Sequence, residues 1–254
     1  HLRRFVKRYC TKLEKIIALT TDQKKDISHL YGITPNKIAV IGVGYDETMF
    51  TRVPKSPAGT VQILYAGKYN RSKGVIWLLK SLMKINHHDW HLHMAGSGSG
   101  PEYDHCIKLA EKLGPKVTNH GYVSHQMLAE LMQKSHVQVL PSFFEGLPLV
   151  LFEGLASGCR IITTRLTGFS EIFGQAKKDT IDLIRLPRLE TLDKPYQKDE
   201  THLEYVLSKS ILNMIAAAKN NPDFDDPQAE KITSHYTWTR VFERTLSVYK
   251  DAIY

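Results

Sequence analysis

Residues 143–158, FFEGLPLVLFEGLASG, decide the fold of this chain because they join one predicted strand to a helix and that helix to the next strand. The β-branched run at residues 136–140 predicts a buried strand that ends in a loop at Pro141. Gly146 permits a tight turn, and we place Pro148 at the first helical position, where proline is tolerated. Gly158 ends the helix, and the apolar residues 161–162 begin the next strand.

The start of this helix is a candidate anion site. Its first N–H groups have no partners within the helix, and the helix dipole is positive at that end. Glu145 lies in the loop before the helix, and Glu153 lies about one and a half turns into it. The two carboxylates therefore flank a position that suits a diphosphate, and vicinal hydroxyl groups of a ribose and a hexose are natural donors to them.

These residues carry a family resemblance. Glu-Gly-x-Pro, with a second Glu eight positions after the first and then Ala-x-Gly, resembles the E-x7-E motif of retaining glycosyltransferases, especially family 4 of the GT-B fold. An ordinary amphipathic helix with two solvated glutamates is the alternative reading of this pattern. The agreement of the flanking segments favours the motif.

The composition is that of a soluble globular protein. A chain of 254 residues with 42% hydrophobic content can form one large or two small domains. No window reaches the apolar length of a transmembrane helix, and the first residues are too basic for a signal peptide. Cys10, Cys106 and Cys159 are widely spaced, which suggests neither a disulfide framework nor a zinc site and fits a cytoplasmic protein.

The net charge of +8 is compatible with anionic ligands, nucleic acid or an acidic membrane surface. Residues 1–15 contain six basic residues and one acidic residue, so this predicted helix carries +5. It is either a solvated basic helix or one that binds the anionic inner face of the membrane. We expect no nucleic acid partner. Because the chain opens with His1 rather than methionine, we expect a processed or truncated piece.

The segments before residue 60 resemble the end of an acceptor domain. A strand at residues 15–20, a helix capped at residues 21–22 and a strand at residues 38–41 precede Gly42-Val43-Gly44-Tyr45-Asp46 and Phe50. We assign residues 1–50 to this N-terminal domain. Residues 51–60 contain two prolines and no periodicity, which predicts an interdomain linker. The resemblance implies that most of the acceptor domain is absent, either truncated or provided by a partner chain.

Residues 61–236 alternate strand and helix patterns, which predicts an α/β fold: a Rossmann-like parallel sheet with helices on both faces. The resemblance identifies this region as the GT-B C-terminal, donor-binding domain. Residues 237–254 are expected to form a helix that crosses back to the acceptor domain. We interpret its apolar stripe as core; the stripe consists of Trp238, Val241, Phe242, Leu246 and Tyr249.

The loop at residues 67–74, GKYNRSKG, resembles the family's Gly-Arg…Lys-Gly loop, with Lys68 at the position of the arginine and Lys73 at that of the lysine. In the family these cations hold the donor diphosphate, where they offset the charge that builds on the leaving group. Lysine lacks the bidentate fork of arginine, so Arg71 is a candidate substitute for Lys68. The resemblance also places the base beside residues 121–123 and the 96–101 turn near the nucleotide.

The resemblance therefore implies the following site residues. Catalytic roles fall on Lys68, Lys73 and Glu145, and donor-binding roles on Arg71, Gly96, Gly121, Tyr122, Val123, Gly146, Leu147, Pro148, Leu149 and Glu153. His87, His88, His91 and His93 lie close together in the sequence, but no carboxylate or cysteine completes a ligand set at the usual spacing, so we expect no metal site. No cofactor is expected beyond the nucleotide-diphosphate sugar that serves as the donor.

The implied function is that of a retaining glycosyltransferase of hexosyltransferase type, which moves a sugar from a nucleotide-diphosphate sugar to an acceptor hydroxyl in bacterial-type polysaccharide or glycoconjugate synthesis. We expect the isolated chain to be inactive without an acceptor domain. One alternative is a non-catalytic donor-binding subunit of a two-chain enzyme. A GT-B sugar-nucleotide epimerase is the other, although it would not require the E-x7-E pair.

Overall fold

The computed structural model describes residues 2–57 and 59–253, and its larger unit is built on a six-stranded parallel sheet with strand order β5-β4-β3-β6-β7-β8. The strands are β3 (Val61–Ala66), β4 (Trp90–Ala95), β5 (Val117–Gly121), β6 (Val137–Leu140), β7 (Arg160–Thr164) and β8 (Ile181–Ile184). Every residue of β6 and β7 is buried, as expected for central strands covered on both faces. The predicted Rossmann-like α/β fold is confirmed.

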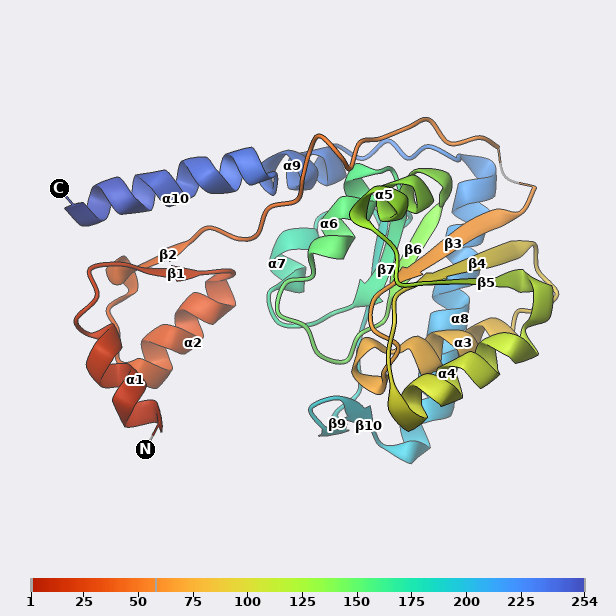
Figure 1. Cartoon of the computed structure of the whole chain (residues 1–254), viewed down its shortest axis with the longest axis horizontal. Helices are drawn as coiled ribbons and strands as arrows, with labels where there is room; N and C mark the ends of the chain where they lie inside the picture. Colours follow the sequence, from red (N-terminus) through yellow and green to blue (C-terminus); the bar gives the residue numbers. More distant parts are fainter. Residues whose placement is uncertain (1, 58, 254) are drawn as a thin grey trace.

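Helices cover both faces of this sheet (Figure 1). On one face, α3 (Val75–Met83) packs against α4 (Gly100–Lys112) and α8 (Gln197–Asn220). On the other, α6 (Leu149–Ala156) packs against α5 (His125–Lys134) and α9 (Pro227–His235), with the short α7 (Phe169–Phe173) nearby. The core between the layers includes the fully buried rings of Tyr65, Trp90 and Phe152.

A smaller unit precedes this domain in the chain and lies beside it (Figure 1). Its parallel strands β1 (Ile16–Ala18) and β2 (Ile38–Val40) are accompanied by α1 (Leu2–Cys10) and α2 (Thr21–Tyr31). Thr20 is the N-cap of α2 and accepts a hydrogen bond from the Gln23 N–H at 3.1 Å, so the predicted cap at residues 21–22 was one residue late.

The C-terminal helix α10 (Trp238–Ile253) extends over the smaller unit (Figure 1). Val241 and Val248 pack against Ile41 at the end of β2. The prediction that the whole apolar stripe forms core was wrong, because Val241 alone of the stripe is buried. The exposed fractions of the others are 47% for Trp238, 63% for Phe242, 53% for Leu246 and 56% for Tyr249.

Four further differences from the sequence-based assignment concern local signals. Pro148 is the N-cap of α6 rather than its first residue. The sequence pattern predicts a helix from about residue 202 to residue 219, whereas α8 begins five residues earlier, at Gln197. The β9 (Leu189–Thr191) and β10 (Lys194–Pro195) hairpin was missed because its strands are too short to show a period. Helix α9 was also missed, although Asp226 caps it by accepting from the Gln228 N–H at 3.0 Å.

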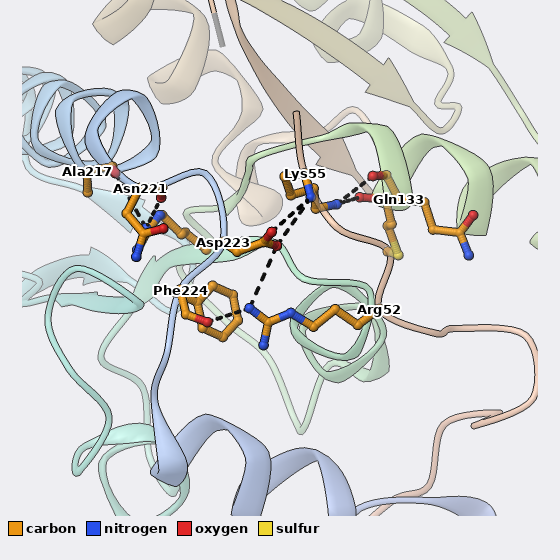
Figure 2. Close-up of polar contacts among 9 residues, drawn as sticks. Arg52, Lys55, Gln133, Ala217, Asn221, Asp223 and Phe224 are labelled. Carbon is orange, nitrogen blue, oxygen red and sulfur yellow. Dashed lines mark hydrogen bonds and ion pairs between the residues drawn. The ribbon is translucent and has the colours of Figure 1, made fainter. Parts of the chain in front are cut away.

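In the predicted linker, the described residues 51–57 and 59–60 have no regular structure, yet side chains of residues 51–57 bind the larger unit (Figure 2). Lys55 is only 7% exposed, and its Nζ donates to the carbonyls of Met132 at 2.8 Å and Gln133 at 2.6 Å, in the last turn of α5. Arg52 donates to the carbonyl of Phe224 and lies 3.8 Å from a carboxylate oxygen of Asp223. The linker therefore lies alongside the segment that connects α8 to α9.

Lys55→Met is expected to lower the free energy of unfolding by about 1–3 kcal/mol, because two buried carbonyls at the end of α5 lose their charged donor while the apolar stem is kept. Urea unfolding measures this. The matched control is Lys134→Met, an exposed position at the same helix end, which should change stability by less than about 0.5 kcal/mol. Equal effects of the two substitutions would show that the Lys55 contacts do not stabilise the fold.

Candidate functional site

A pocket of about 470 Å³ opens at the carboxyl ends of the central strands. The strand order reverses between the neighbours β3 and β6, and ligands of open α/β sheets bind at such a switch point. The lining comes from the ends of β3 to β6, the loops after them and the start of α6. It consists of Ala66, Gly67, Lys73, Ala95, Gly96, Tyr122, Val123, His125, Leu128, Leu140, Glu145, Pro148, Leu149, Val150 and Glu153.

Lys73 and Glu145 form an ion pair in this pocket. Nζ of Lys73 donates to Oε1 of Glu145 at 2.6 Å, and Oγ of Ser142 donates to the same oxygen at 2.8 Å. The side chain of Glu145 is only 9% exposed, and that of Lys73 is 26% exposed. The backbone N–H of Phe143 donates to the carbonyl of Ser72 at 2.8 Å. The loops after β3 and β6 are thereby held together, with a cation and a carboxylate at their contact.

Glu153 lies on α6 and lines the same pocket without any hydrogen-bond partner for its carboxylate among residues 2–57 and 59–253. Its neighbours in the helix, Phe152 and Gly154, are buried. Burial raises the pKa of Glu153 from 4.5 to about 7. An unpartnered carboxyl with a raised pKa inside a pocket is typical of a group that meets its partners on a ligand.

The N-terminus of α6 faces the pocket between these two carboxylates. Pro148 is its N-cap, and Leu149 and Val150 of the first turn line the pocket. The first N–H groups of a helix lack intrahelical acceptors, and the dipole adds a partial positive charge. Lys73 adds a cation to the same pocket, and its charge is paired there with that of Glu145. The pocket can therefore accommodate an anion such as a diphosphate next to groups that accept from hydroxyls.

The structure brings only part of the predicted site together. Lys73, Glu145, Pro148, Leu149, Glu153, Gly96, Tyr122 and Val123 line the pocket, whereas Lys68, Arg71, Gly121, Gly146 and Leu147 do not. Lys68 is exposed, and Arg71 pairs with Glu102 at 3.7 Å and faces a different pocket. Asn70 caps the short 3-10 turn Arg71–Lys73, whose geometry points residues 71 and 73 in different directions.

Sequence reasoning assigned no site role to seven of the lining residues: Ala66, Gly67, Ala95, His125, Leu128, Leu140 and Val150. A usable signal existed for His125. Serine is favoured at helix N-caps, and Ser124 directly precedes α5. Its Oγ accepts from the Met127 N–H at 3.2 Å, which fixes the start of that helix at the pocket. Leu128 and Val150 gave no such signal, because an apolar residue near a helix start has the same pattern whether it lines a pocket or the core.

The histidines of β4 and β5 form a small hydrogen-bonded group. Nδ1 of His93 lies 3.0 Å from Nε2 of His120, and Nε2 of His91 lies 2.8 Å from Oγ1 of Thr118. Within the described ranges, no three His, Cys, Asp or Glu side chains are arranged to hold a metal ion. None of the helices in those ranges has both the length and the apolar character needed to cross a membrane.

Comparison with known proteins identifies relatives of the chain and structures with the same fold. Residues 60–184 match the family model described as glycosyl transferases group 1. Over 249 residues the chain is 25% identical to a glycogen synthase of Mycobacterium tuberculosis, covering 94% of this chain and 54% of that protein. A glycosyltransferase from Rickettsia africae has a similar structure, with a TM-score of 0.71, 19% identity and coverage of 98% and 67%. The pneumococcal O-GlcNAc transferase GtfA, solved with UDP and GlcNAc, has a TM-score of 0.73, 14% identity and coverage of 98% and 47%.

The fold, the pocket and these matches define a glycosyltransferase domain of the GT-B fold. Within that class, residues 60–184 belong to the group 1 family of glycosyltransferases. The chain spans about half the length of the glycogen synthase that it matches.

Proposed function

We propose that this chain is the donor-binding half of a retaining glycosyltransferase that transfers a hexose from a nucleotide-diphosphate sugar to an acceptor hydroxyl. The observation that carries the proposal is the convergence, in one pocket at the switch point of the sheet, of a cation, two carboxylates and a helix N-terminus. The acceptor side is then formed by residues beyond those of this chain or by a partner chain. We place the reaction in polysaccharide or glycoconjugate synthesis.

Each group has a role in this proposal. Lys73 and the start of α6 bind the diphosphate, where positive charge offsets the negative charge that develops as the glycosidic bond breaks. Glu153 accepts from the ribose hydroxyls and Glu145 from the transferred sugar. When the phosphates bind, the ion pair between Lys73 and Glu145 weakens because Lys73 also interacts with the phosphates. Because Lys73 supplies the positive charge, no metal ion is needed. The presence of UDP and GlcNAc in the structure of GtfA supports this class of ligand.

A thermal-shift comparison of UDP, ADP and GDP with the corresponding nucleosides tests the proposal. At 100 times its dissociation constant, a diphosphate that binds the folded chain adds about 2.7 kcal/mol of stability. We expect at least one diphosphate to stabilise the chain and every nucleoside to stabilise it less. The proposal fails if no diphosphate has an effect.

Lys73→Ala is expected to weaken nucleoside diphosphate binding by about 1.5–3 kcal/mol, the scale of a lost hydrogen bond to a charged group, and to change nucleoside binding much less. Calorimetric titration of both ligands measures the difference. Lys108→Ala, at an exposed position on α4, is the matched control and should leave both affinities unchanged. Equal weakening of diphosphate and nucleoside by Lys73→Ala would place this lysine away from the phosphates.

A further inference from the structure

The strand at one edge of the large sheet, β8, has a free side. Within residues 2–57 and 59–253 it pairs with β7 alone. The Arg165 N–H donates to the carbonyl of Ile184 at 2.8 Å, so Ile184 directs its backbone groups toward β7. Because successive residues of a strand direct their backbone groups to opposite sides, those of Leu183 and Arg185 point away from β7. These groups form the free edge of the sheet.

The outward backbone groups of this edge have no partner within the protein. The N–H groups of Leu183 and Arg185 and the carbonyl of Leu183 make no hydrogen bond in the described part of the chain. Ile181 also points outward; its N–H donates back to the carbonyl of Lys177 at 2.8 Å, and its own carbonyl is free. A row of donors and acceptors at this spacing is a template for an added strand.

A groove of about 520 Å³ runs along this edge. Residues 181–185 form its floor. One wall is formed by Phe173 at the end of α7 and by Gly174 and Ala176 after it, and the other by residues of α8 between Tyr205 and Asn213. The groove shares no lining residue with the donor pocket. An extended main chain can therefore approach β8 between the two helical layers.

Positive charge dominates this groove. Its lining contains four cations and one carboxylate: Arg165, Lys178, Arg185, Lys209 and Asp182. All four cations are exposed, and none of them forms an ion pair among residues 2–57 and 59–253. The carboxylate is already engaged, because its Oδ2 accepts from Oγ of Ser210 at 2.5 Å. The groove therefore favours an acidic occupant.

Part of this charge lies on one side of the groove. The contact with Ser210 shows that the Asp182 side chain faces α8. Side chains alternate along a strand, so Arg185 faces the opposite layer, which contains α7. Arg165 follows the last paired residue of β7 and lies opposite Arg185 in the parallel register. An added strand with carboxylates at alternate positions would therefore present them all to the side that holds Arg165 and Arg185.

We propose that the groove along β8 is an interaction surface for an extended acidic segment of a partner protein, which adds to the free edge as a further strand. Its backbone pairs with that of Leu183 and Arg185, and its carboxylates bind Arg165, Lys178 and Arg185. A second copy of β8 is disfavoured as the added strand, because it carries the same cations. The interaction does not depend on the sugar-transfer reaction.

Capped peptides test the proposal at pH 7. The first alternates glutamate and valine, and two matched peptides have glutamine or lysine in place of glutamate. Amide hydrogen exchange of the ¹⁵N-labelled chain is recorded during each titration. At saturation, the glutamate peptide should slow exchange at Leu183 and Arg185 by at least about tenfold, because their N–H groups become hydrogen-bonded. The glutamine and lysine peptides should bind at least about fivefold more weakly, since they lack the carboxylates.

Two N-methylated forms of the glutamate peptide test the backbone pairing. One is methylated at every valine and the other at every glutamate. An added strand uses the N–H groups of only one of its edges, so one form should bind and the other should not. A purely electrostatic attraction would bind both forms equally.

A double substitution in the chain completes the experiment. Arg165→Gln/Arg185→Gln should raise the dissociation constant of the glutamate peptide at least about fivefold. The control Arg188→Gln, at an exposed position outside the groove, should change it less than about twofold. The proposal is overturned if exchange at Leu183 and Arg185 is not slowed saturably, if both methylated forms or all three parent peptides bind equally, or if the two chain variants behave alike. It is also overturned if inorganic tripolyphosphate slows exchange at the same amides, which would assign the groove to small anions.

Discussion

Replacing Glu153 with glutamine is expected to change the pH dependence of stability, so that the variant gains up to about 3 kcal/mol relative to the wild type between pH 4 and pH 8. Burial raises the pKa of this carboxyl from 4.5 to about 7 in the folded state. As the pH rises from 4.5 to 7, the unfolded chain loses the proton that the folded chain keeps. Wild-type stability therefore falls through this window and stays low above it, whereas a glutamine does not titrate.

Urea unfolding of both proteins at pH 4, 6 and 8 measures this gain. Glu130→Gln, at an exposed position on α5, is the matched control and should follow the wild type at each pH. A constant difference between Glu153→Gln and the wild type across the range would contradict the burial argument. A residue whose replacement stabilises the fold but weakens ligand binding is retained for function.

The second large effect is expected at Gly74. Gly74→Ala should lower the free energy of unfolding of the chain by about 3 kcal/mol or more. Gly74 has a φ of +69°, and a Cβ on it would lie 2.0 Å from the carbonyl oxygen of Pro141. Neither of these backbones can move easily, because Gly74 is the N-cap residue of α3 and Pro141 directly follows β6. The substitution forces apart the two loops that hold Lys73 and Glu145.

Two other glycines separate the causes of this loss. Gly100 has a φ of +76° but open space around its Cβ position, so Gly100→Ala should cost only the backbone strain, about 1 kcal/mol. Gly146 does not have a positive φ, and a Cβ added to it would have no neighbour within 4 Å apart from the adjacent residues. Gly146→Ala should therefore change stability very little. Thermal unfolding of the three variants gives the ranking. If Gly74→Ala lowers stability no more than Gly100→Ala does, the loops that carry Lys73 and Glu145 can separate without a loss of stability.

Much of the sheet could be predicted from the sequence, because local patterns determine where its strands begin and end. The strands Val61–Ala66 and Ile181–Ile184 are each a short apolar run between turn residues, and this pattern predicts a strand with these bounds. The order of Glu145, Pro148 and Glu153 around a helix start also followed from spacing alone. These features depend on residues that are close together in the chain.

Features that depend on tertiary packing could not be predicted in this way. Lys73 and Glu145 are 72 residues apart, and their contact exists because β3 and β6 are neighbours in the sheet. Arg71 and Lys73 carry the same charge on one loop, but only the capped 3-10 turn shows that they face different pockets. The exposed stripe of α10 has the same period as a buried one, so periodicity could not reveal its environment.

We propose that Glu153 and Glu145 contact different parts of one sugar nucleotide, and one set of titrations tests these two roles. Glu153→Ala and Glu145→Ala are titrated by calorimetry with the best-binding nucleoside diphosphate and with its hexose conjugate. Glu153→Ala should weaken binding of the bare diphosphate by about 1.5–3 kcal/mol. Glu145→Ala should leave that affinity nearly unchanged and remove the extra affinity that the hexose provides. These two roles are contradicted if Glu145→Ala weakens binding of the bare diphosphate as much as Glu153→Ala does.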